Sequence, residues 1–165
     1  MTEANFNGKI KPRKLLVIDE AHNIETELSK FIEVSVHERF AKTTLKLVIP
    51  DITSHHQAYM WIKDVYYPKL TSHVDHIEKM LEKYGKLKEK LDQFVSLTRQ
   101  LHMIQGHHQR LGDFLRVHQK DNWVFEMLES DVKGLRKISF KPIDVSQFAQ
   151  QFLFRLGYHV LCMSA

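Results

Sequence analysis

The chain has 165 residues, with 24 Lys and Arg against 20 Asp and Glu, which gives a formal net charge of +4. Hydrophobic residues make up 43% of the chain and charged residues 27%, which is enough apolar side chain for a folded core and excludes general disorder. The single cysteine, Cys162, excludes an internal disulfide and any zinc or iron–sulfur site built from several cysteines of this chain.

The first zone, residues 1–36, predicts a strand followed by a helix. Its basic leader lacks the apolar core of a secretory signal, and no run of the chain approaches the roughly 20 apolar residues of a membrane span. We therefore expect an intracellular, cytoplasmic protein without membrane contact. Residues 15–18 are continuously apolar, which is typical of a strand buried on both faces in a parallel sheet. Asn23 is placed to cap the helix that follows, and the apolar side of this helix carries Ile24, Leu28, Phe31 and Ile32.

Residues 34–36 predict a short extended piece, and the second zone, residues 37–120, predicts helix almost throughout. Apolar residues recur at spacings of three and four from Ala58 to Phe114, which is typical of long helices packed side by side. We expect an antiparallel helical bundle.

Four residues mark the expected interruptions of these helices. The first helix, through Phe40, Thr44 and Leu47, should stop near Pro50. Pro68 should kink or break the next helix, because proline lacks the backbone N–H. Gly85 and Gly106 are candidate turns.

The third zone, residues 121–165, returns to mixed structure. Residues 123–125 and 138–140 predict short strands around a polar turn at 129–134. Asp144 and Gln147 have capping-box spacing for a helix that should end at Gly157 and bury Val145, Phe148, Ala149, Phe152 and Leu156. Residues 160–163 form a second apolar run, in which Cys162 should be a buried, inert thiol.

Two buried-type strands thus bracket the helical zone. We predict a mainly α protein with a small α/β part, in which residues 1–36 and 121–165 belong to one α/β domain and residues 37–120 form a helical insertion. Ligands of open α/β sheets bind at the carboxyl ends of the strands, and polar or small residues follow both strands here.

The acid pair Asp19-Glu20 directly after the first strand is the strongest chemical signal. Phosphoryl transfer needs a carboxylate at Mg²⁺ and a group that activates the attacking water, and two adjacent acids on a rigid strand can supply both. Asp19 would hold Mg²⁺, Glu20 would activate the water, and His22 could contact a moving neighbour. The alternative is a surface acid pair that caps the next helix.

The run Leu-Leu-Val-Ile-Asp-Glu-Ala-His at 15–22 resembles motif II, the DEAH form of the Walker B motif, of superfamily two helicases. The chain as a whole resembles the DinG/XPD-like DNA helicases. Asn-Ile-Glu at 23–25 and Val-Ser-Val at 34–36 follow as in that family, a helical insertion of the size of its Arch domain comes next, and Lys-Pro-Ile-Asp-Val-Ser at 141–146 precedes the last helix. Met-Ser-Ala at 163–165 is similar to the start of motif III, Ser-Ala-Thr.

This resemblance implies a segment of an ATP-dependent DNA helicase, with the Arch helping to enclose single-stranded DNA during 5′ to 3′ movement. Asp19 would be the Mg²⁺-linked acid, Glu20 the catalytic base and His22 a coupling residue, while Ser164 and Ala165 would link ATP hydrolysis to strand movement. The family's arrangement also implies that residues 14–19 and 159–163 pair in parallel.

Other parts of the helicase would lie outside this sequence. The chain contains no G-x-x-x-x-G-K-[ST] phosphate loop, so we predict no ATP hydrolysis by these 165 residues alone. The second motor domain is absent as well, and an iron–sulfur cluster, where the full protein has one, would be bound upstream of residue 1. The two strands without the rest of their sheet would expose edges through which copies could associate.

A run of lysines offers a candidate DNA contact. Between residues 52 and 119 there are ten Lys or Arg and seven Asp or Glu, and a cluster surrounds Tyr84: Lys79, Lys83, Lys86, Lys88 and Lys90. The alternative is an ordinary solvated helix face, because acids interleave with these lysines. A helical module that binds single-stranded DNA or a partner protein without catalysis is therefore the rival function.

Three histidine groups raise the question of a metal site: 55–56, 73 with 76, and 107–108. No cysteine or regular carboxylate pattern completes one, so structural or surface roles are expected. Trp61, Tyr66 and Tyr67 are expected to pack in the bundle rather than to stack on bases.

Overall fold

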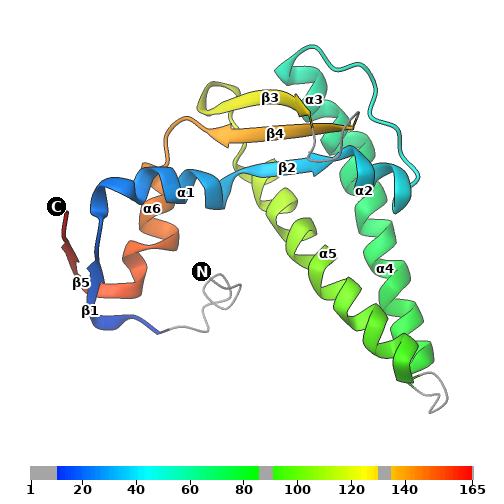
Figure 1. Cartoon of the computed structure of the whole chain (residues 1–165), viewed down its shortest axis with the longest axis horizontal. Helices are drawn as coiled ribbons and strands as arrows, with labels where there is room; N and C mark the ends of the chain where they lie inside the picture. Colours follow the sequence, from blue (N-terminus) through cyan, green and yellow to red (C-terminus); the bar gives the residue numbers. More distant parts are fainter. Residues whose placement is uncertain (1–10, 86–90, 130–134, 165) are drawn as a thin grey trace. The chain divides into compact units, whose positions relative to one another are not determined.

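A computed structural model describes residues 11–85, 91–129 and 135–164. It is mainly helical with a small sheet part, as predicted, and its chain divides into two compact units (Figure 1). The first unit combines residues 1–33 with 141–165, and the second comprises residues 34–140. The expected boundaries after residues 36 and 120 differ from this division, because three strands that flank the helical zone pair with one another inside the second unit.

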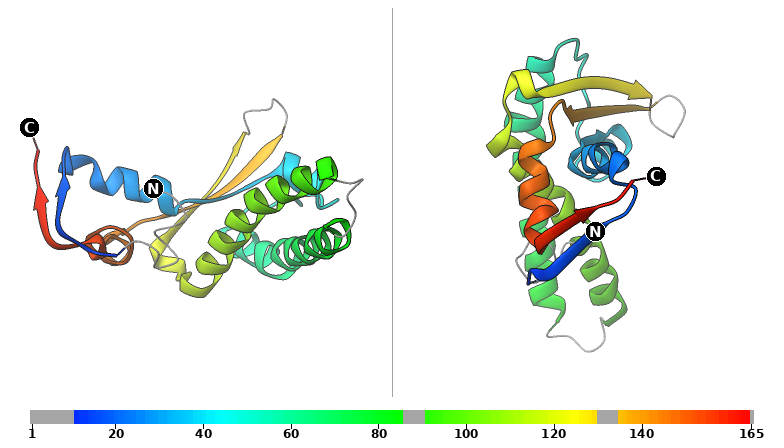
Figure 2. Two further views of the ribbon diagram at one scale, coloured as in Figure 1. Left: turned by 90° about the horizontal axis from the view of Figure 1, so that it is seen from below. Right: turned by 90° about the vertical axis from the view of Figure 1, so that its left-hand side faces the viewer.

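The first unit contains a two-stranded parallel sheet. β1 (Arg13–Ile18) pairs with β5 (Gly157–Cys162), with Leu15 opposite His159 and Ile18 opposite Cys162 (Figure 2). This confirms the parallel pairing predicted between the two ends of the chain. Helices α1 (Ile24–Ile32) and α6 (Ser146–Phe152) complete the unit, with short 3₁₀ turns at Ala21–Asn23 and Phe154–Leu156.

The predicted burial of these two strands was wrong. Leu15 is 53% exposed and Leu161 47% exposed, and Cys162, expected to be buried, is exposed as well. Continuous apolar runs are typical of strands covered on both faces, but the described part of this sheet contains no strand beyond β1 and β5. Association of copies through these strands stays a prediction.

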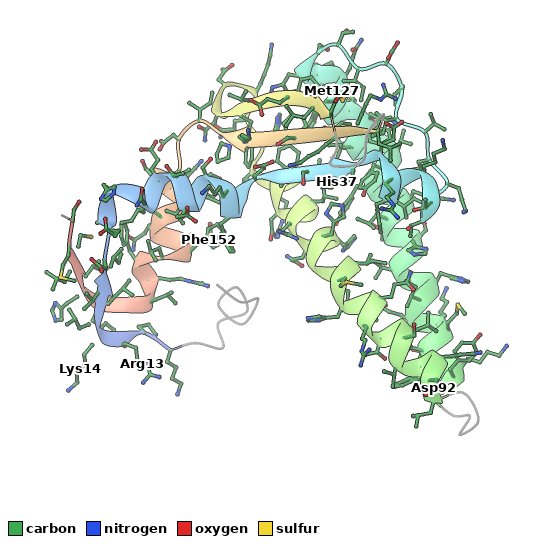
Figure 3. The ribbon with its side chains drawn as sticks, viewed as in Figure 1. Arg13, Lys14, His37, Asp92, Met127 and Phe152 are labelled. Atoms are coloured by element: carbon green, nitrogen blue, oxygen red, sulfur yellow. The ribbon has the colours of Figure 1, made fainter. Side chains whose placement is uncertain are left out.

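The helices of the first unit pack through their apolar sides as predicted. Leu28 and Ile32 of α1 are buried, and Phe31 meets Phe152 of α6, which Figure 3 labels, edge-to-face at 6.0 Å between ring centroids. The expected caps were wrong in detail. The side chain of Asn23 makes no capping hydrogen bond.

The start of α6 also differs from the predicted capping box. Asp144 Oδ1 accepts hydrogen bonds from the backbone N–H and the hydroxyl of Ser146, at 2.8 and 2.6 Å, and these bonds lower the pKa of Asp144. In this turn the Asp144 side chain bonds to Ser146, two positions onward, whereas the predicted capping box pairs it with Gln147, three positions onward. The helix ends at Phe152 rather than at Gly157, which begins β5.

The second unit contains a three-stranded sheet in the order β2–β4–β3. Its strands are β2 (Val34–His37), β3 (Trp123–Glu129) and β4 (Arg136–Pro142), which confirms all three short strands predicted. β2 and β4 run antiparallel, with Val34 opposite Phe140. The polar turn expected at 129–134 lies, apart from Glu129, outside the described residues.

The helices of this unit are α2 (Glu38–Thr43), α3 (His55–Trp61), α4 (Tyr67–Tyr84) and α5 (Leu91–Val117). A π-helical stretch, Ile62–Tyr66, joins α3 to α4, so one continuous helix passes Pro68. Of the predicted kink or break, the break is wrong. Proline removes a hydrogen bond and its ring clashes with a carbonyl four residues earlier. The wider π turn directly before Pro68 accommodates both effects.

Two expectations for the middle zone need correction. The first helix ends at Thr43, well before Pro50; Lys46 has a left-handed backbone with φ 57°, and residues 44–54 are not helical. Gly85 does end α4, but Gly106 lies inside α5, where an isolated glycine costs only about 1 kcal/mol. The helical part is therefore an antiparallel hairpin of α4 and α5 beside a sheet, rather than a bundle of helices (Figure 1).

Aromatic rings form the core of the second unit. Phe114 of α5 contacts Trp123 and Phe140 of the sheet, each at 4.9 Å between ring centroids. Tyr66 is fully buried and Tyr67 stacks on His108, which confirms the predicted packing role of these tyrosines. None of the described helices is apolar over the length that a bilayer crossing requires.

A partly buried ion pair joins the start of β4 to α2. Arg136 donates to Glu38 Oε2 at 3.3 Å and to the carbonyl oxygens of Ile49 and Pro50. The hydrogen bonds from Arg136 lower the pKa of Glu38. The guanidinium thereby satisfies backbone carbonyls of the loop that follows α2, which has no ladder partners of its own.

Candidate functional site

The acid pair follows β1 on a backbone that reverses sharply. Glu20 has φ 52° and ψ 46°, the left-handed conformation, which costs a non-glycine residue on the order of 1 kcal/mol. The backbone N–H of Glu20 donates to Asp19 Oδ1 at 3.0 Å, which orients the Asp19 carboxylate. Strained backbone of this kind occurs preferentially at functional sites.

The parallel pairing extends beyond the strands and brings the two ends of the chain together. Met163 N–H donates to the Ile18 carbonyl at 2.8 Å, and Ala21 N–H donates to the Met163 carbonyl at 2.7 Å. The Ser164 hydroxyl therefore lies 2.9 Å from His22 Nδ1, although 142 positions separate the two residues. Glu20 Oε2 lies 3.3 Å from the same nitrogen.

The structure thus gathers Glu20, His22 and Ser164 into one exposed cluster, with Asp19 beside it. The remaining predicted coupling residue, Ala165, lies outside the described residues. A pocket of about 550 Å³ next to the cluster is lined by Asp19, Glu20 and Glu27 together with apolar side chains of α1 and Leu153. Mg²⁺ in nucleotide sites is usually held by one or two carboxylates together with phosphate and water oxygens, and Asp19 could supply one such carboxylate.

A close contact joins β1 and β5 at the start of β5. A Cβ added to Gly157 would lie 2.6 Å from Leu16 Cβ and 3.0 Å from Leu16 N, atoms that cannot shift unless β1 and β5 separate. A Cβ on Gly112 would instead meet the hydroxyl of Tyr67 at 2.8 Å, the far end of a side chain.

We expect Gly157→Ala to lower the free energy of unfolding of the first unit by about 1–3 kcal/mol, the usual cost of overpacking. Gly112→Ala is the matched control, and its helix gains up to about 1 kcal/mol from alanine. Hydrogen exchange of the β1 and β5 amides, with urea denaturation of both variants, measures the difference. Equal protection of these amides in the two variants would contradict the expectation.

Of the lysines considered for DNA contact, the structure describes two. Lys79 and Lys83 are exposed on α4, whereas Lys86, Lys88 and Lys90 lie outside the described residues. Neither described lysine forms an ion pair with a described residue. Their acidic neighbour Glu78 accepts a hydrogen bond from Gln105 of α5 at 3.0 Å.

Four histidines make side-chain contacts inside the second unit. His55 Nε2 lies 2.7 Å from His118 Nε2, the Tyr66 hydroxyl lies 2.9 Å from His107 Nε2, and Thr71 Oγ1 lies 2.9 Å from His108 Nε2. These are the structural roles predicted for His55, His107 and His108. Among the residues that the structure describes, no three His, Cys, Asp or Glu side chains form a group that could hold a metal ion.

A second pocket, of about 690 Å³, lies in the second unit and includes Arg39 and Arg110 in its lining. Sequence analysis missed it, because its residues come from β2, α2, Tyr66 and α5 and no local pattern links them.

No protein-family model matches this chain, and no curated protein matches it in sequence.

Proposed function

We propose that this chain is the segment of a DinG/XPD-like ATP-dependent DNA helicase that runs from the DEAH box through the Arch domain to motif III. The observation that supports this most is the hydrogen bond between His22 and Ser164 across the parallel pair β1–β5. Two sequences at opposite ends of the chain, each similar to a helicase motif, meet at one sheet edge. A helix-capping role for the acids would require no such meeting.

Within this proposal each residue of the cluster has one task. Mg²⁺, when bound with ATP, neutralises charge on the phosphates. Asp19, oriented by the Glu20 backbone N–H, would hold that ion. The Glu20 carboxylate, which lines the pocket beside Asp19, would accept the proton of the attacking water.

The same geometry supports a coupling role for His22. Its Nδ1 lies between Glu20 Oε2 and the Ser164 hydroxyl, so a change at the Glu20 carboxylate reaches the segment after β5 through one side chain. The second unit would be the Arch, and its exposed Lys79 and Lys83 are available to the phosphates of a single strand.

Ser164→Ala in the full-length protein tests the coupling. We expect the rate of ATP hydrolysis to stay within about threefold of the wild type. The amount of DNA unwound per ATP should fall about fivefold, because the variant loses one neutral hydrogen bond of about 1 kcal/mol. Ser96→Ala, an exposed serine of α5, is the control. Equal unwinding per ATP in the two variants would contradict the coupling role.

The proposal also requires a phosphate-loop motif outside residues 1–165. Sequencing the reading frame on both sides of this segment tests that requirement directly. A G-x-x-x-x-G-K-[ST] motif upstream and a threonine directly after Ala165 would support the helicase. Their absence would end the helicase proposal and favour the non-catalytic module, whose sheet and helix hairpin at 34–140 form a compact unit by themselves.

A further inference from the structure

The pocket of about 690 Å³ in the second unit falls within the range of small-molecule sites, about 300–1,000 Å³. Its wall includes His37 at the carboxyl end of β2, where α2 begins (Figure 3). The other walls come from α2, from Tyr66 and from the middle of α5. None of its residues belongs to the Glu20–His22–Ser164 cluster.

The charge around this pocket has one sign. Arg39 of α2 and Arg110 of α5 both line it, and none of the described residues that line it is Asp or Glu. Arg110 Nε donates to the Gly106 carbonyl at 3.3 Å, which positions the guanidinium, and no carboxylate among the described residues pairs with either arginine. Both arginine side chains are exposed, so they are accessible to a ligand from solvent. Two guanidinium groups without a carboxylate partner beside one pocket favour an anion, and their planar forks match a phosphate.

Aromatic and apolar groups occupy another part of the wall. Phe40 and His107 meet edge-to-face at 6.0 Å between ring centroids, and the Tyr66 hydroxyl holds His107 Nε2 at 2.9 Å. Burial lowers the pKa of His107 to about 4, so its ring is a neutral aromatic surface at pH 7. Met103, also in the wall, is 70% exposed and offers a flexible apolar contact.

We propose that this pocket binds a nucleotide unit, with its phosphate held by Arg39 and Arg110 and its base against Phe40 and His107. A bare anion would leave the aromatic wall uncovered, and an apolar ligand would make no use of the two guanidinium groups. A base with an attached phosphate satisfies both parts of the wall. The unit belongs either to a free nucleotide or to a single strand of nucleic acid.

The inference goes beyond the proposed ATP hydrolysis, because this pocket and the acid cluster share no residue. The inference of a nucleotide site depends on the proposed helicase function only if the bound nucleotide unit is part of a DNA strand that the helicase moves along. Binding to the 165-residue chain can therefore fail while hydrolysis by the full-length protein stands, and the reverse also holds.

Titration of the 165-residue chain, followed by NMR, tests the site with three probes: deoxythymidine monophosphate, thymidine and inorganic phosphate. We expect the nucleotide to bind at least about tenfold more tightly than either part, since hydrogen bonds to charged groups contribute about 1.5–3 kcal/mol. The double variant Arg39→Gln with Arg110→Gln should weaken nucleotide binding at least tenfold. Arg99→Gln with Arg116→Gln makes the same change in net charge outside the pocket and should weaken it less than twofold.

Two further measurements complete the test. If the NMR spectrum shows that the double variant is unfolded, the single variant Arg110→Lys takes its place in the test. Lysine keeps the positive charge but lacks the planar set of donors of a guanidinium group. Ten-residue oligothymidylate distinguishes the sources. A strand is identified if the oligonucleotide binds tenfold more tightly than the mononucleotide and if the slope of log binding constant against log salt concentration falls in magnitude by about 1.4 in the double variant. A free nucleotide is identified if the oligonucleotide and the mononucleotide bind equally tightly. Inorganic phosphate that binds as tightly as the nucleotide, or a double variant that binds like the wild type, would overturn the proposal.

Discussion

Glu20→Gln in the full-length protein should reduce ATP hydrolysis by about 10²–10⁴-fold, the usual contribution of a general base. An amide cannot accept the proton of the attacking water, yet it has nearly the same size as the carboxylate and leaves the left-handed backbone at position 20 unchanged. ATP binding should therefore stay largely in place. Single-turnover hydrolysis and equilibrium binding of ATP, measured on the same preparation, separate the two effects.

The control for this change is Glu25→Gln, because Glu25 is exposed on α1 and does not line the pocket beside Asp19. It should hydrolyse ATP at the wild-type rate. Loss of ATP binding by Glu20→Gln, with hydrolysis of the residual bound ATP unchanged, would contradict the role of base. Wild-type turnover would favour the helix-capping alternative.

The free energy of unfolding of the second unit should fall by about 3 kcal/mol between pH 7 and pH 4 through His107 alone. Burial, with Arg110, His37 and His108 nearby, lowers the pKa of His107 from 6.5 to about 4. Between these two values the unfolded chain binds more protons than the folded chain, so stability is present above pH 6.5 and is lost as the pH falls. Burial also lowers the pKa of His118 to about 4, which acts in the same direction.

His107→Gln isolates this contribution. The amide can still form a hydrogen bond with the Tyr66 hydroxyl but does not titrate, so the variant should lose less stability on acidification than the wild type. The control is His102→Gln, which removes an exposed imidazole from the same helix. Urea denaturation at several pH values measures the slopes, and a wild-type slope for His107→Gln would show that this ring does not supply the pH dependence.

The elements with a strong local pattern were predictable from the sequence. Four consecutive apolar residues at 15–18 predicted β1, and the spacing of Leu70, Val74 and Ile77 predicted the helix that buries them. The partnership of β1 with β5 came from resemblance, since no local pattern specifies which strand a buried-type strand will pair with.

The failures have physical causes in tertiary structure. The exposure of Leu15 and Cys162 depends on which layers cover a sheet, and an apolar run does not contain that information. Gly106 stays helical, and the residues after it, His107 and His108, contact Tyr66 and Thr71 across the hairpin, whereas Gly85 is the C-cap of α4. The Arg39–Arg110 pocket joins residues 71 positions apart, and no spacing rule reaches that far.

The antiparallel pair β2–β4 has a consequence for how this chain folds. Because Val34 lies opposite Phe140, the two ends of the second unit are held together once that unit has folded. The long loop between β1 and β5 is then shortened to two brief connections, which lowers the entropy cost of its closure by about 1 kcal/mol. Pairing of β1 with β5 should therefore cost less chain entropy after the second unit has folded than before it.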